Sequence, residues 1–392
     1  MMRGGGVWYL SLQHALHRRG QTGILVACLG VTLFLPAAAD VLLARYERDL
    51  RARAAGTPLV LGSRGNRFDL TLAALYFRAS ELEPVPTAEL ARIRDAGLGV
   101  AVPIHARFTA RGHPVVGTSP EYFELRGLAA RDGALPLFVG EAALGANVAR
   151  KLGLGPGEAL FSDQKELYDI SKPPALKMRV CGVLAEAGTP DDDAVFVDVK
   201  TAWILEGLAH GHGDVTKEVD ESLVLGRTDD SVTVSLALIE YNEVTPENAA
   251  SFHVHTGPGA LPLTAILVFP PDDKARTVLK ARVNAEHEYQ MLVPSEVIAD
   301  LLAFVFRIKS LFDTVTAVLA VTTLALTTLV VLLSMRLRRA EMRTLDRIGA
   351  SRFTVAKLYA TEIALVLVGS ALLAGAGVGA ASYALPNLLR VL

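Results

Sequence analysis

Two apolar segments in the C-terminal part of the sequence constrain its fold more than any other feature. Residues 314–334 and 363–385 contain no charged side chain. A charge-free apolar run of about 20 residues is long enough to cross the hydrocarbon core of a bilayer. A helix that is apolar on every face is rarely found at that length in a soluble protein. We therefore expect two transmembrane helices in this region.

A third apolar segment covers residues 22–43, near the N-terminus. Residues 25–28 resemble a lipoprotein cleavage box, and residues 36–39 resemble a signal-peptidase site. Most of the apolar stretch, however, follows Cys28, and the pattern continues past residue 39 into an apparent helix. We therefore expect a retained transmembrane helix, in which Pro36 removes one backbone hydrogen bond.

These segments predict an α-helical membrane protein with three transmembrane helices and a large α+β extracytoplasmic domain between the first and the second. Short basic segments stay in the cytosol, and basic residues cluster before the first span and between the last two. The N-terminus is therefore expected inside and the large domain outside. The expected divisions are an amphipathic cytosolic helix (1–20), TM1 (21–45), the outer domain (46–308), TM2 (311–335), a cytosolic link (336–352), TM3 (360–385) and a short outer tail (386–392).

The bulk composition excludes some classes of function. The net charge is −2, which gives no general attraction for nucleic acid. Only Cys28 and Cys181 are present, so the outer domain cannot form an internal disulfide. A disulfide-free outer domain suits a bacterial cell envelope better than an animal extracellular module.

The outer domain alternates short strand-like and helix-like patterns, which is typical of an α+β fold. An insertion is expected at 119–251. Strands are expected at 59–61, 100–104, 106–110, 114–117, 177–184, 194–197, 231–239, 264–269 and 288–293, and helices at 46–55, 87–96, 119–125, 141–152, 201–208, 274–285 and 294–307.

Few residues indicate a catalytic, cofactor-binding or metal-binding function. No GxxxxGK[ST] phosphate-binding loop and no nucleophile–base arrangement is present, so we expect no catalytic residue and no cofactor on this chain. Histidine pairs at 210/212 and 253/255 carry the only metal-binding hypothesis; exposed loop histidines are the competing interpretation. They are His210, His212, His253 and His255.

Small and hydroxyl residues predict helix packing within the spans. Thr323 and Thr327 belong to a threonine-rich TM2, and Gly375 and Gly379 form a small-xxx-small pair in TM3. Small residues let helix backbones approach closely. We expect these four positions to face a partner helix.

The link between the last two spans has the pattern of a short helix. Met342, Leu345 and Ile348 recur at helical spacing among charged residues, and Gly349 can end the helix. An apolar stripe on a charged helix can bind in a groove of a soluble partner. The alternative is a topology anchor whose arginines keep the link in the cytosol.

The order of these features resembles the permease subunits of the MacB/FtsX/LolC group of ABC systems. The resemblance rests on the link RAEMRTLDRIGASR (339–352) with Glu362 after it, and on four outer-domain segments in the same order. Those segments are LVLGSRG (59–65), VGTSPEYF (116–123), LGANVARKL (144–152) and VCGV (180–183). Together with the link, these segments span most of the chain.

The resemblance implies a non-catalytic permease subunit in the bacterial cytoplasmic membrane, with its outer domain in the periplasm. Its partners would be a cytosolic ABC ATPase carrying ATP and Mg²⁺, a second permease copy or paralogue, and an extracytoplasmic protein or lipoprotein. Such systems transmit ATPase motion outward to export or extract a lipoprotein, peptide or hydrophobic compound. The implied ATPase-coupling residues are Arg338, Arg339, Glu341, Met342, Leu345, Ile348 and Gly349.

One departure from that family keeps a second function class open. The family has a fourth span after the third, whereas this sequence stops at Leu392. We expect either a shortened member or a missing helix that another chain supplies. The alternative function is a membrane-anchored structural or regulatory protein that binds a partner without ATP coupling.

Overall fold

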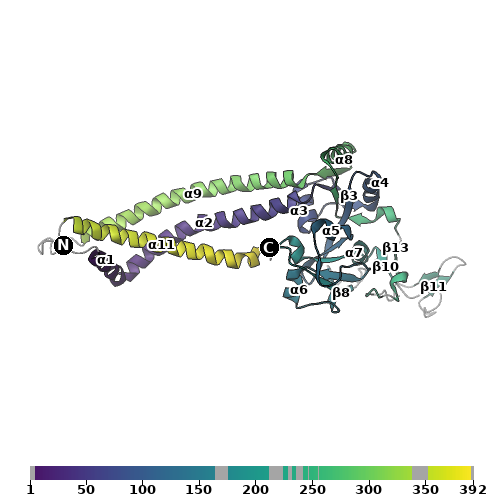
Figure 1. Ribbon diagram of the computed structural model, residues 1–392, viewed down its shortest axis with the longest axis horizontal. Helices are drawn as coiled ribbons and strands as arrows, with labels where there is room; N and C mark the ends of the chain where they lie inside the picture. The colour runs from purple at the N-terminus through teal and green to yellow at the C-terminus, as the bar shows by residue number, and fades with distance from the viewer. Residues whose placement is uncertain are drawn as a thin grey trace. The chain divides into compact units, whose positions relative to one another are not determined.

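The computed structural model forms two compact units, which are described separately (Figure 1). One unit is Met1–Arg48 with Leu302–Leu392, and the other is Asp49–Leu301. The structure describes residues 5–163, 175–211, 224–227, 232–234, 242–245, 247–254, 256–337 and 352–389.

Long helices make up the first unit. In the part of the chain that the structure describes, three are long and apolar enough to cross a membrane, and their candidate spans lie within Arg19–Ala55, Pro294–Val330 and Ala356–Tyr383. The helices that contain the first two of these spans also include residues of the second unit. The helices are α1 (Gly5–His17), α2 (Arg19–Ala55), α9 (Pro294–Leu337) and α11 (Arg352–Leu389).

Glycines allow α2 and α11 to approach closely. A Cβ atom added to Gly377 would lie 2.8 Å from Cδ2 of Phe34, and one added to Gly369 would lie 3.3 Å from Cγ2 of Val26. Gly375 and Gly379, the pair that the sequence singles out, would meet no atom within 4 Å. The close α2–α11 contact therefore uses other glycines than the predicted pair, whose partner helix stays a prediction.

The threonines of α9 satisfy their hydroxyl groups within the helix. Thr323 donates to the Leu319 carbonyl at 2.8 Å, and Thr327 donates to the Thr323 carbonyl at 2.7 Å. Hydroxyls that bond back to the preceding turn add no unpaired polar group to an apolar surface. These bonds leave open whether Thr323 and Thr327 also face a partner helix.

An ion pair joins α2 to α9. The Lys309 ammonium lies 2.7 Å from Oδ1 of Asp40 and 2.5 Å from Oδ2 of Asp313. A carboxylate in an apolar helix is costly unless it has a partner. Lys309 therefore offsets the charge of Asp40 and ties the first long helix to the second.

The second unit is built on a mixed ten-stranded sheet with the order β16-β1-β15-β3-β4-β9-β6-β8-β5, in which β7 also pairs with β8. Its two parallel pairs are β4 with β9 and β6 with β8. The strands are β1 (Leu59–Ser63), β3 (Val100–Ala110), β4 (His113–Thr118), β5 (Ala130–Gly133), β6 (Glu141–Leu144), β7 (Ala159–Phe161), β8 (Lys177–Leu184), β9 (Val195–Asp198), β15 (Ala265–Phe269) and β16 (Tyr289–Leu292).

Short helices and three small two-stranded sheets complete this unit. The helices are α3 (Arg67–Tyr76), α4 (Thr87–Asp95), α5 (Glu121–Arg126), α6 (Ala146–Leu152), α7 (Val199–Leu205) and α8 (Asp273–Ala285), with 3-10 turns η1 (Pro190–Asp193), η3 (Ala249–Ser251) and η4 (Pro258–Ala260). The small sheets pair β2 (Val85–Pro86) with β14 (Pro262–Leu263), β10 (Ala209–His210) with β13 (His253–Val254), and β11 (Val224–Arg227) with β12 (Val232–Val234).

Among the described residues, two apolar cores lie along the ten-stranded sheet. The first gathers buried side chains of β1, β15, α8 and β16, and the second gathers those of β6, β8, β9 and α6. Helix α7 contributes to both, because Trp203 belongs to the first core and Ala202 to the second. The predicted insertion at 119–251 contains the strands from β5 to β9, so these residues extend the sheet and add a core.

Several predicted elements are confirmed. The strand at 177–184 is β8, the strand at 264–269 contains β15, and the helix at 274–285 lies within α8. The two strands predicted at 100–104 and 106–110 are one strand, β3, with a register shift between His105 and Phe108 in its pairing with β4.

The helix predicted at 141–152 is wrong in its first half. Residues Glu141–Leu144 form strand β6, and the helix α6 begins only at Ala146. Gly145 separates them, and a Cβ atom there would lie 2.3 Å from the carbonyl oxygen of Asp191. The buried position of β6 between β8 and β9 overrides the helix-like spacing. Helix α3 was not predicted, and part of the strand predicted at 231–239 lies outside the described residues.

The α2–α11 contact gives a matched pair of variants. Gly377→Val should destabilise the chain by about 1–3 kcal/mol, because the new methyl groups overlap the Phe34 ring. Gly379→Val also replaces a helix glycine by valine, but a Cβ atom at this position has no neighbour within 4 Å. Thermal unfolding of the detergent-purified chain compares the two. Equal melting temperatures would contradict the packing described here.

Candidate functional site

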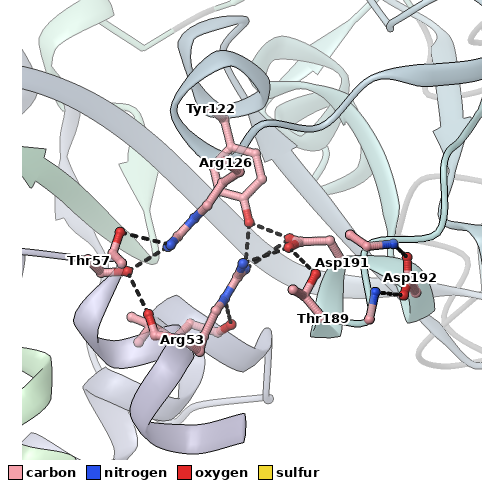
Figure 2. A network of polar contacts seen from close by, with 11 residues as sticks. Arg53, Thr57, Tyr122, Arg126, Thr189, Asp191 and Asp192 are labelled. Atoms are coloured by element: carbon pink, nitrogen blue, oxygen red, sulfur yellow. Dashed lines mark hydrogen bonds and ion pairs between the residues drawn. The ribbon is translucent and has the colours of Figure 1, made fainter.

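A buried arginine near the C-terminal end of α2 is the centre of a network of polar contacts in the described outer domain (Figure 2). Arg53 donates from Nη1 to Oδ2 of Asp191 at 2.6 Å and from Nη2 to Oδ1 at 2.9 Å. The side chains of Arg53 and Asp191 are only 5% and 1% exposed. This bidentate geometry fixes the orientation of the guanidinium and of the carboxylate.

Other elements satisfy the remaining polar atoms of the pair. Arg53 also donates to the Leu75 carbonyl of α3 at 3.2 Å and to the Tyr122 hydroxyl at 2.8 Å. Tyr122 in turn donates to Oδ1 of Asp191 at 2.5 Å, and Thr189 donates to Oδ2 at 2.7 Å. Three elements therefore meet at the end of α2: α3, α5 and the turn η1.

Local backbone bonds place Asp191 for this role. The next residue, Asp192, accepts hydrogen bonds from the backbone N–H groups of Ala187 and Gly188 at 2.9 and 2.7 Å. These bonds close the loop that leads into η1 (Figure 2). The absent side chain of Gly145 lets the carbonyls of Asp191 and Asp192 approach strand β6. The Asp191 carboxylate is therefore held by the loop as well as by Arg53.

Aromatic rings exclude water from the ion pair. The rings of Tyr122, Phe123 and Phe196 pack with centroid distances of 5.5–5.9 Å. Phe77, which ends α3 in a left-handed conformation, packs edge-on against Phe196 at 6.0 Å and lies 5.9 Å from the Arg53 guanidinium carbon. Removal of water strengthens the attraction between the opposite charges and makes any unpaired charge costly.

A second arginine holds the chain just after α2. Arg126 of α5 donates to the Gly56 carbonyl at 3.0 Å and to the Thr57 hydroxyl at 2.6 Å. Thr57 donates back to the Arg53 carbonyl at 3.3 Å, and the Arg126 guanidinium lies 5.7 Å from the Tyr122 ring. Helix α5 therefore contacts the end of α2 both at Arg53 and at the residues that follow.

The titration of the acidic partners follows from this environment. Burial alone would raise the pKa of Asp191, but the Arg53 charge and hydrogen bonds from Arg53, Tyr122 and Thr189 outweigh it and hold the pKa below its ordinary value. Burial raises the pKa of Tyr122 well above its ordinary value. Asp191 is thus a carboxylate and Tyr122 a neutral hydroxyl at physiological pH, as the hydrogen bonds require.

The residues that the sequence singles out lie elsewhere. The coupling residues, Arg338 to Gly349, lie outside the described residues, as do His212 and His255. His210 and His253 are brought together by the β10–β13 pairing. Among the described residues, no group of three His, Cys, Asp or Glu side chains could hold a metal ion.

Sequence reasoning did not find the Arg53 site. Arg53 and Asp191 are far apart in the chain, and neither stands in a recognisable motif. Tyr122 does belong to the VGTSPEYF segment, which is one of the segments that carry the resemblance. The available signals were an arginine in the last turn of the helix that follows the first apolar span and a run of three aspartates at 191–193.

Loss of either charge of the ion pair should destabilise the outer domain strongly. Arg53→Met or Asp191→Asn should each cost roughly 3–5 kcal/mol, because each leaves the partner group buried and unpaired. The double variant should be more stable than the sum of the two single losses predicts. Denaturant unfolding of the full chain in detergent measures all three.

An exposed ion pair supplies the control for that series. Arg150 and Glu186 are 61% and 59% exposed and lie 3.1 Å apart. Arg150→Met should cost about 1 kcal/mol or less, because water already solvates both charges. Similar losses for Arg53→Met and Arg150→Met would contradict the importance given to the buried pair.

Acidification should weaken the same site. A carboxyl group with a lowered pKa in the folded state stabilises the fold above its unfolded pKa of about 3.9, and that stabilisation is lost as pH falls through the folded value. The free energy of unfolding should therefore fall below about pH 4. Asp191→Asn should flatten this fall relative to the wild-type chain. An identical pH slope in both proteins would contradict the assignment.

This chain is similar to a known protein family and to solved structures. Residues 44–240, half of the chain, match the family model for the MacB-like periplasmic core domain. The structural comparison returns the periplasmic region of MacB from Actinobacillus actinomycetemcomitans, at 11% identity and a TM-score of 0.37, covering 64% of this chain and 95% of that one. It also returns the extracellular domain of the noncanonic ABC-type transporter YknZ from Gram-positive bacteria, at 12% identity and a TM-score of 0.33, covering 60% and 98%.

The comparison with curated proteins finds no match. The family match covers the Arg53 site, including Tyr122 and Asp191. The chain contains a MacB-like periplasmic core domain and belongs to the MacB/FtsX-like ABC transporter permeases.

Proposed function

We propose that this chain is a permease subunit that transmits the motion of a separate ABC ATPase across the bacterial cytoplasmic membrane to its outer domain. The N-terminus lies in the cytosol and the outer domain on the far side of the membrane. ATP and Mg²⁺ are held by the ATPase, and a second permease copy or paralogue completes the complex. The ATPase-driven motion exports or extracts a lipoprotein, a peptide or a hydrophobic compound.

The observation that carries this proposal is that both connections to the outer domain are uninterrupted helices. Helix α2 runs from Arg19 to Ala55 and helix α9 from Pro294 to Leu337. A helix resists bending and stretching, unlike a flexible linker of Gly and Ser. A shift or rotation at one end of such a helix is therefore passed to the other end.

The Arg53 site supplies the attachment that transmission needs. Its bonds hold the last turn of α2 to α3, to α5 and to η1. A guanidinium with several fixed partners resists both rotation and translation of the helix that carries it. Movement of α2 would then move those elements rather than slide past them.

The cytosolic input is assigned to residues 338–349, on the resemblance and on the apolar stripe of Met342, Leu345 and Ile348. Such a stripe buries itself in a groove on a partner, and the charged residues around it set the orientation. The competing function, a membrane-anchored structural or regulatory protein without ATP coupling, does not require an apolar stripe in this segment.

Substitution of one stripe residue and one charged neighbour tests the proposal. Glu341→Ala with Leu345→Ala should abolish co-purification with the ATPase encoded beside this chain and remove the change that the chain causes in ATPase turnover in nanodiscs. Thr344→Ala changes a neighbour outside the stripe and should leave both readouts intact. A folded, membrane-inserted wild-type chain that neither binds the ATPase nor alters its turnover would overturn the proposal and favour the structural or regulatory alternative.

A further inference from the structure

Helix α1 is attached to two of the long apolar helices. Its last residue, His17, is separated by a single residue from the start of α2 at Arg19. It also packs against α11, where the hydroxyl of the buried Ser11 donates to the Leu358 carbonyl at 3.3 Å (Figure 1). These two attachments determine the level at which α1 lies along α2 and α11.

The contacts between α2 and α11 show where their charge-free stretches begin. The close approaches at Gly369 and Gly377 pair positions that advance together along both helices, so α2 and α11 run in the same direction. The same register places residue 20 of α2 beside residue 363 of α11. Each of these residues is the first of a charge-free stretch. A bilayer whose hydrocarbon core begins at that level suits both helices at once.

The bond to Leu358 places α1 beside that level, on its polar side. Leu358 lies five residues before Ile363, which corresponds to about 7 Å along a helix. The headgroup region on one side of a bilayer is about 5–8 Å thick. In such a bilayer, Ser11 therefore lies at the depth of the lipid headgroups.

Helix α1 is also inclined to the axis of α11. Ser11 and Val26 are fifteen residues apart in the sequence. Their contacts on α11, Leu358 and Gly369, are only eleven residues apart. A straight extension of α2 would need equal separations, because each residue adds about 1.5 Å to either helix. The break at Arg18 between α1 and α2 accommodates the excess length.

A second face of α1 is apolar and exposed. Trp8, Leu12 and Leu16 recur every four residues and form one stripe, with Tyr9 beside it. Tryptophan and tyrosine are enriched where membranes meet water, because their rings are apolar and carry a polar group. This stripe therefore suits the boundary between headgroups and acyl chains better than bulk water.

The charged residues that flank α1 in the sequence are all positive. Residues 1–39 contain Arg3, Arg18 and Arg19 and no aspartate or glutamate. Arg19 is exposed and Arg18 half-buried at the junction of α1 with α2. An apolar helix face flanked by arginine is typical of helices that lie on anionic membranes. The charge of this end of the chain therefore complements anionic lipid headgroups.

We propose that the exposed stripe of α1 binds anionic phospholipids of the cytosolic leaflet. Trp8, Leu12 and Leu16 contact the upper acyl chains, and Arg18 and Arg19 contact the headgroup phosphates. The bound helix keeps the adjoining ends of α2 and α11 at a fixed depth. This inference rests on the membrane placement in the proposed function, and it does not depend on ATP coupling.

Quenching of Trp8 by brominated lipids tests this assignment. Full-length wild type is reconstituted in vesicles of equal parts phosphatidylglycerol and phosphatidylcholine, with bromine on the acyl chains of one lipid at a time. Both brominated lipids should quench part of the fluorescence, and brominated phosphatidylglycerol should quench about twofold more. Trp8→Phe should lose this quenching, because Trp203, the only other tryptophan, is buried in the outer domain.

Two arginine variants and the position of the bromine sharpen the test. Arg18→Gln with Arg19→Gln should be quenched equally by either brominated lipid, whereas Arg150→Gln, at an exposed site of the outer domain, should keep the wild-type difference. Bromine near the headgroup end of the acyl chain should quench more than bromine near its methyl end. No quenching of wild type, equal quenching by the two lipids, or the reverse order of depths overturns the proposal.

The ATPase is the competing occupant of this face. Addition of the ATPase with ATP should leave the quenching of Trp8 unchanged, and loss of quenching in the complex would assign the stripe to the ATPase and overturn the lipid site. The two proposals can fail separately. Quenching of Trp8 in a chain that binds no ATPase supports the lipid site and overturns the permease function, and ATPase binding without quenching does the opposite.

Discussion

A guanidinium group withdrawn from water governs the arrangement of the outer domain. The desolvation of such a charge costs several kcal/mol unless other groups replace the lost water. Arg53 therefore requires a carboxylate, a hydroxyl and a carbonyl at fixed places, and these come from Asp191, Tyr122 and Leu75. Parts of the chain that are distant in sequence must meet at one helix end before the charge can be buried.

The same requirement gives the site its stiffness. Asp191 is fixed by its loop, Tyr122 by aromatic packing and Arg53 by the helix, so each partner is held independently of the ion pair. Well-packed apolar residues can replace a buried ion pair without loss of stability, but they would lose the directional bonds that set the rotation of the last turn of α2. Buried ion pairs are weak evidence for stability, and their value here lies in orientation.

Sequence patterns predict well the features that depend on local properties. The apolar helices follow from their length and lack of charge, and β8 and β15 follow from their composition. Strand β6 was missed because its short, alanine-rich sequence EAAL fits a helix until β8 and β9 enclose it. The Arg53–Asp191 bond and the His210–His253 pairing depend on tertiary register, which no single segment encodes.

The strand order of the sheet also bears on how the domain is made. Strand β1 is the first of the domain, yet both of its neighbours come from the end of the domain's sequence, with Val268 opposite Leu59 and Leu292 opposite Val60. Pairings between such distant segments close large loops and form slowly. During synthesis, β1 emerges long before β15 and β16 and has no sheet to join. The apolar residues of β1 must therefore be kept from aggregation until the whole domain has been synthesised.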